Sequence, residues 1–140
     1  MTLPKQKFRE LVFQILFSSH FLDGDEKDAG FYMQQLKTTK KTVEEAFSKV
    51  EKIVELKPKL DEEIAKVSTS YDVDRIQSVE MNILRLSVYD LLFNREMPAK
   101  IVISEGIRLA KKFSTKESLT FINALLDQLY KNNQDLAYNA

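Results

Sequence analysis

The sequence contains no cysteine and only three glycines and three prolines among its 140 residues. Without cysteine the chain has no disulfide framework, no thiolate metal site and no cysteine nucleophile. So few turn-forming residues argue against many short strands and favour long helices. No apolar run approaches the roughly 20 residues that cross a bilayer. Charged residues lie among the apolar residues of the first twenty positions, so the hydrophobic core of a signal peptide is absent there. We therefore expect a cytoplasmic protein that does not contact a membrane.

The sequence also lacks net charge, because 21 lysines and arginines balance 21 aspartates and glutamates. A dedicated nucleic-acid-binding domain is usually basic overall. Any RNA affinity must therefore come from a local basic patch or from a partner that supplies positive charge. What the chain does have is 44% hydrophobic residues, which suffices for a hydrophobic core in one domain of this length.

Apolar residues recur at the three- and four-residue spacing of helices and predict about seven helices without a strand. The expected helices cover 4–21, 28–37, a segment from Thr42 to Pro58, about 60–67, about 74–94, a segment from Pro98, and one from Ser114. Glu45 and Glu117 complete capping-box patterns with Thr42 and Ser114. The apolar band over 76–92 is too broad for a surface helix, so this helix should be central. The predicted fold class is all-α: a single compact bundle over 1–131, followed by a polar tail at 132–140.

Residues suited to catalysis are sparse. The single histidine, His20, falls near the end of the first helix and cannot form a zinc site alone. Asp23, Asp25 and Glu26 lack the glycine and terminal glutamate of a calcium-binding loop. There is no glycine-rich phosphate loop. We predict that the protein is not an enzyme and needs no cofactor or metal.

Three blocks in the C-terminal half carry the most specific signal. They are VEMNILRLSVYDL at 79–91, MPAKIVISE at 97–105 with RLAKKF at 108–113, and SLTFINALLD at 118–127. In order and spacing they resemble the NusB family of bacterial transcription antitermination factors. The segment RELVFQILF at 9–17 is similar to the opening helix of that family, whereas residues 22–70 match only in helical character. The resemblance implies a NusB-like helical fold without catalytic activity.

The resemblance also implies partners. Members pair with the NusE-type ribosomal protein, and the pair binds boxA-type RNA within the RNA polymerase antitermination complex, which promotes processive transcription of ribosomal RNA operons. Phe121 would stack on a base, and of the family's arginine-rich N-terminus only Arg9 keeps its identity. The matching RNA-binding positions are Lys5, Lys7, Arg9, Tyr71, Lys100, Lys111 and Phe121, and those facing the protein partner are Phe17 and Glu80.

Each assignment has an alternative. Phe121 would also suit the core, and the N-terminal cations would also suit a solvated terminus. Glu80 would need a partner if buried, which could be Arg85 or Lys66 of the same chain. For the whole protein, the alternatives are a helical protein-interaction module with lost or weak RNA binding, and a detached targeting domain of an RNA methyltransferase type. That chemistry needs a cysteine and a methyl-donor domain, which this chain lacks.

Overall fold

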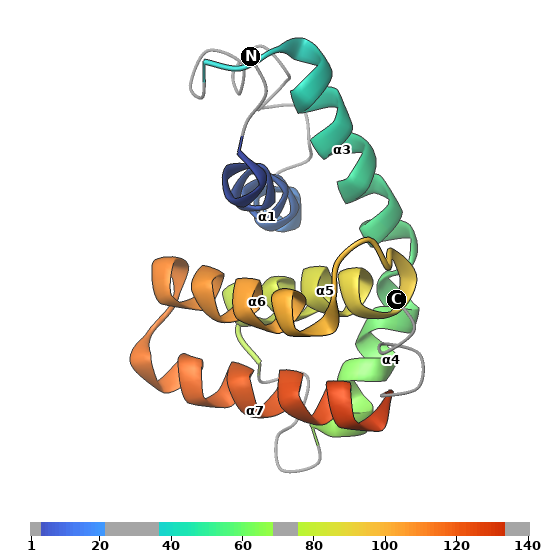
Figure 1. Ribbon diagram of the computed structural model, residues 1–140, viewed down its shortest axis with the longest axis vertical. Coiled ribbons are helices and arrows are strands. Elements are labelled where there is room, and N and C mark those ends of the chain that lie inside the picture. The colour runs from blue at the N-terminus through green and yellow to red at the C-terminus, as the bar shows by residue number, and fades with distance from the viewer. Residues whose placement is uncertain (1–3, 22–36, 69–75, 134–140) are drawn as a thin grey trace. The chain divides into compact units, whose positions relative to one another are not determined.

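A computed structural model describes residues 4–21, 37–68 and 76–133 (Figure 1). Every regular element in these ranges is helical, as predicted. The elements are α1 (Lys5–Phe21), α3 (Lys40–Glu55), α4 (Lys57–Val67), α5 (Ser78–Val88), the π-helix η2 (Tyr89–Phe93), α6 (Ala99–Phe113) and α7 (Lys116–Asn132). The predicted helix over 28–37 lies outside the described residues except for Lys37, and so do the side chain of His20 and the whole of Tyr71.

The two predicted capping boxes are wrong, because a neighbouring threonine caps each helix instead. At the start of α3, the backbone N–H of Thr42 donates to Oγ1 of Thr39 at 3.2 Å. At the start of α7 the N-cap residue is Thr115 rather than Ser114, and its Oγ1 accepts from the backbone N–H of Ser118 at 3.2 Å. A threonine oxygen thus satisfies one of the free N–H groups of each first turn.

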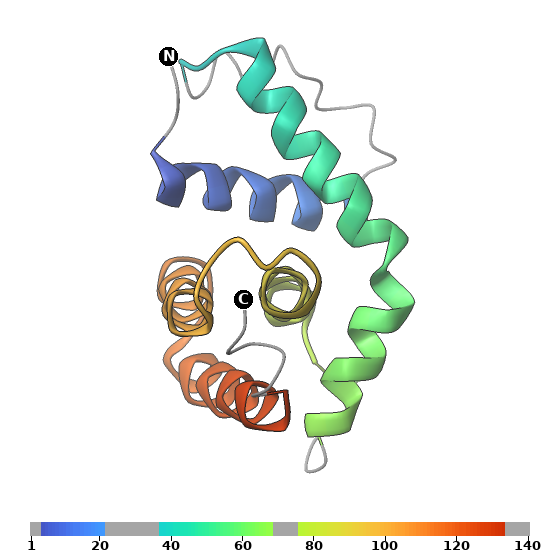
Figure 2. The same ribbon diagram turned by 45° about the vertical axis from the view of Figure 1, so that its right-hand side comes forward.

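The chain divides into two compact units, residues 1–55 and 56–140. In the first unit α1 packs across α3, and Figure 2 shows the two helices crossing at an angle. The apolar positions that predicted these helices are the ones that the structure buries. They are Leu11, Val12, Phe13, Ile15 and Leu16 on α1, and Val43, Ala46, Val50 and Ile53 on α3.

In the second unit α5 contacts α4, α6 and α7, and every residue over 80–91 is buried. The broad apolar band therefore marks a central helix of this unit, as predicted. The π-helix η2 continues α5 and ends at Phe93, and the backbone N–H of the following residue, Asn94, donates to the carbonyl of Tyr89 at 2.8 Å. Gly106 lets α6 approach α5 and α7 closely, since a Cβ at this position would lie 2.7 Å from Cδ1 of Leu126 on α7 and 2.9 Å from Oγ of Ser87 on α5.

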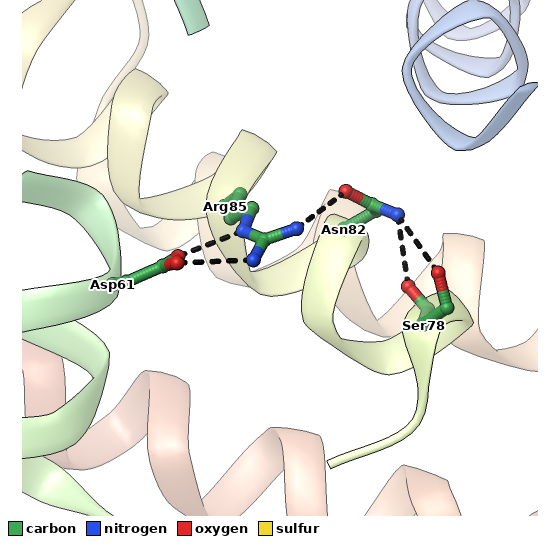
Figure 3. Close-up of polar contacts among 4 residues, drawn as sticks. All are labelled: Asp61, Ser78, Asn82 and Arg85. Carbon is green, nitrogen blue, oxygen red and sulfur yellow. Dashed lines mark hydrogen bonds and ion pairs between the residues drawn. The ribbon is translucent and has the colours of Figure 1, made fainter. Parts of the chain in front are cut away.

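Helix α5 carries a buried polar chain that also ties it to α4 (Figure 3). Arg85 donates from Nε to Oδ1 of Asp61 at 2.7 Å and from Nη2 to Oδ2 at 3.0 Å. Its Nη1 donates to Oδ1 of Asn82 at 3.1 Å, and Asn82 Nδ2 donates to the carbonyl of Ser78 at 3.0 Å. The guanidinium therefore has acceptors on all three nitrogens, as a buried cation requires.

Replacing Asp61 with alanine should lower the free energy of unfolding by about 2–3 kcal/mol, because Arg85 would keep its burial and lose its carboxylate. We expect less than the ~3–5 kcal/mol typical of a fully buried pair, since the Asp61 side chain is 30% exposed. The double variant Asp61→Ala/Arg85→Met should recover most of the loss. Urea unfolding measures the stability of the single and the double variant. Glu62→Ala, which removes an exposed carboxylate from α4, is the control. Equal losses of stability in Asp61→Ala and Glu62→Ala would show that the pair of Asp61 with Arg85 does not stabilise the fold.

Candidate functional site

The N-terminal cations all lie on α1 but do not share one face. Lys5 and Lys7 are exposed and Arg9 is half-buried. Lys5 and Arg9 are four residues apart and therefore neighbours on the helix surface, whereas Lys7 points elsewhere. Its Nζ lies 3.4 Å from Oε2 of Glu10. Lys5 and Arg9 thus share one face of α1, and Lys7 lies on another face beside Glu10.

Phe17, predicted to face a protein partner, lies further along α1. Its ring stacks on that of Phe13, with centroids 6.0 Å apart and an interplanar angle of 18°. Phe13 is buried, whereas Phe17 is only half-buried. Phe17 is therefore held by an intramolecular ring contact while part of its surface stays accessible.

Lys100 and Lys111 lie on one exposed stripe of α6, about three turns and about 16 Å apart along the axis. The acidic residue of this helix, Glu105, is buried, and its Oε2 lies 3.0 Å from Nε of Arg108. The exposed residues of α6 are Lys100, Ile101, Ser104, Lys111 and Lys112. Every exposed charge on this helix is therefore positive, although the whole chain is neutral.

Phe121 lies on α7, which packs along α6. It is half-buried, whereas its neighbours Ile122 and Leu125 are buried. The ring thus lies at the margin of the core and keeps an accessible part. The second unit therefore carries three of the predicted RNA-binding residues, Lys100, Lys111 and Phe121, on two packed helices. The role of each in RNA binding stays a prediction.

Glu80 has an intramolecular partner that sequence reasoning missed. The carboxylate is buried on α5, and Ser118 donates from Oγ to its Oε1 at 2.9 Å. Arg85 and Lys66, the partners expected from the sequence, are each engaged with another carboxylate. Ser118 lies 38 residues away in the sequence, and no local pattern signals such a contact. This hydrogen bond ties the start of α7 to the start of α5.

Tyr89 begins the π-helix, and burial raises the pKa of its hydroxyl above the usual value of about 10. The nearby carboxylates of Asp90 and Glu96 act in the same direction. The hydroxyl thus stays protonated at neutral pH.

Among the residues that the structure describes, no group of three histidine, cysteine or acidic side chains is arranged to hold a metal ion. None of the helices in those same ranges has the length and apolar character to cross a membrane.

Comparison with protein families matches residues 6–131 to the NusB family model. The chain belongs to the NusB family. The transcription antitermination protein NusB of Trichlorobacter lovleyi is 35% identical over 127 residues, which cover 89% of each chain. NusB of Thermotoga sp. strain RQ2 is 33% identical over 134 residues, 95% of this chain and 94% of the relative. These relatives confirm the predicted family.

The solved structure of T. maritima NusB superposes on this chain with a TM-score of 0.77 at 30% sequence identity. The match covers 94% of this chain and 93% of that one. The all-helical NusB-like fold is therefore confirmed. Membership in the NusB family makes the chain a transcription antitermination factor rather than an enzyme.

Ser118→Ala should lower the free energy of unfolding by about 1–2 kcal/mol, because the buried carboxylate of Glu80 would lose its donor. Thr120→Ala, an exposed position on the same helix, serves as control and should change stability by less than about 0.5 kcal/mol. Thermal and urea unfolding measure the difference. If the two variants unfold alike, the hydrogen bond contributes nothing to stability.

Proposed function

We propose that this protein binds boxA-type RNA together with a NusE-type ribosomal protein, and that the complex promotes processive transcription of ribosomal RNA operons by RNA polymerase. The work takes place in the bacterial cytoplasm, where transcription occurs. The protein contributes no chemistry to this process. It holds RNA and protein together.

The observation that carries the RNA part of this proposal is the exposed surface of α6, where every charge is positive. RNA phosphates are bound by lysine and arginine side chains, and the binding releases counterions. Lys100 and Lys111 lie on one stripe, so one RNA strand running along α6 would meet both. Within residues 4–21, 37–68 and 76–133, neither lysine forms an ion pair.

The half-buried ring of Phe121, part of which stays accessible, supports the same function. Single-stranded RNA is bound by basic grooves combined with aromatic side chains on which bases stack. Because α7 packs along α6, the aromatic side chain and the lysines belong to neighbouring helices. On α1, Lys5 and Arg9 add a second basic pair. Phe17 and Glu80 remain the proposed contacts for the ribosomal protein.

Lys100→Ala/Lys111→Ala should weaken binding of boxA-type RNA roughly tenfold near 0.1 M salt in the presence of the NusE-type partner. The slope of log affinity against log salt should fall by about 1.4, since each phosphate contact to a single strand contributes about 0.7. Fluorescence anisotropy of labelled RNA across a salt series measures both quantities.

The matched control for this experiment is Lys41→Ala/Lys59→Ala, which removes two exposed lysines from α3 and α4. It should leave affinity and salt slope near the wild-type values. Equal weakening in both double variants would mean that net charge alone drives binding. Wild-type protein that binds the ribosomal protein but no RNA would favour the interaction-only function.

Phe121→Leu should weaken RNA binding by about 1–3 kcal/mol, the value typical for losing a stacked base. Leucine keeps most of the apolar volume next to Ile122, so Tm should fall by only a few degrees. Anisotropy and thermal unfolding of the same preparation separate the two effects. A large drop in Tm with unchanged affinity would show that Phe121 serves the core.

A further inference from the structure

The loop between η2 and α6 contains an arginine, Arg95, whose guanidinium group is incompletely hydrogen-bonded among the residues that the structure describes. Nε and Nη2 of Arg95 are buried, and neither forms a hydrogen bond. Among the described residues this side chain forms no ion pair either, although Asp90 and Glu96 lie within five residues of it. Asp90 instead accepts from Nδ2 of Asn94 at 3.4 Å, and Glu96 is exposed.

This state is unfavourable for the free protein. A buried guanidinium nitrogen that loses its water and gains no acceptor costs free energy. Arg85 shows the contrast, since acceptors occupy all three of its nitrogens. An arginine side chain in a surface loop can rotate outward, so an acidic group presented to this loop would give Arg95 the acceptors that the chain does not supply.

The surroundings of Arg95 favour a phosphate over other anions. Lys100 follows on the first turn of α6, is exposed, and has no acidic residue in that turn. Phe93, at the end of η2, is 41% exposed. Two cations and an accessible aromatic side chain thus occur within eight residues of the chain, from 93 to 100. Cations and aromatic rings together bind phosphates and stack bases in single-stranded nucleic acid. The planar fork of arginine also matches a phosphate with two parallel hydrogen bonds.

We propose that Arg95 binds a phosphate of the RNA and extends the α6 surface beyond Lys100 to the loop after η2, with Phe93 as the adjoining base contact. This inference rests on the proposed function. It adds a site at the N-terminal end of α6, whereas Lys111 lies near the other end of that helix. An RNA strand that follows α6 would meet Lys111, Lys100 and Arg95 in turn.

Arg95→Met tests the inference by measuring both Tm and RNA affinity. If Arg95 binds RNA, its loss should lower the affinity and raise Tm, whereas loss of an arginine that stabilises the fold would lower Tm. With Arg95 unpaired in the free protein, its removal should raise Tm by a few degrees. Affinity for boxA-type RNA in the presence of the NusE-type partner should fall roughly tenfold, and the salt slope should fall by about 0.7. Arg95→Lys should retain the salt slope but not the full affinity. Lys59→Met, which removes an exposed cation from α4, should change neither Tm nor affinity.

Three results would overturn the inference. Unchanged RNA affinity in Arg95→Met would do so, as would a loss of affinity that accompanies a lower Tm. Weaker binding of Arg95→Met to the ribosomal protein without RNA would assign Arg95 to a protein carboxylate instead. The proposed function is judged separately on the wild-type protein. If the wild-type protein with its partner does not bind RNA, the proposed function and this inference both fail. If the wild-type protein binds RNA and Arg95→Met binds it equally well, the inference fails and the proposed function stands.

Discussion

A charge buried in a folded chain must find an opposite charge or a hydrogen-bonding partner, and α5 depends on this constraint. The helix is buried along nearly its whole length yet carries Glu80, Asn82 and Arg85. Each is satisfied: Glu80 by Ser118 of α7, and Arg85 by Asp61 of α4 and by Asn82. The polar groups of the central helix therefore select which helices can lie against it.

The charges on α6 follow the opposite pattern. Its carboxylate is buried and paired with Arg108, while Lys100 and Lys111 are exposed and form no ion pair with any described residue. A neutral chain thereby presents a basic surface on one helix. The separation of paired interior charges from unpaired surface cations explains how zero net charge is compatible with a proposed role in RNA binding. Arg95 departs from both patterns, because it is partly buried and yet unpaired.

Much of the fold could be predicted from patterns among residues close in the sequence. The contacts between residues far apart in the sequence could not. The apolar band over 76–92 identified the central helix of the second unit. The helix starts were misassigned because adjacent hydroxyl residues compete for the cap, and Thr39 and Thr115 occupy it. The π-helix escaped notice since a change in hydrogen-bond register has no residue signature. The Glu80–Ser118 contact and the unpaired state of Arg95 depend on the folded environment alone.

The spacing of the two α6 lysines also determines what size of ligand the helix can distinguish. Their separation of about 16 Å along the axis exceeds the ~8 Å over which mobile ions screen charges at physiological ionic strength. Each ammonium group therefore acts as an independent attractor. A mononucleotide or an inorganic anion can occupy one but cannot bridge the pair. Only an extended polyanion would gain from both at once, so in the proposed function the geometry of one helix would favour oligomers over the abundant small phosphates of a cell.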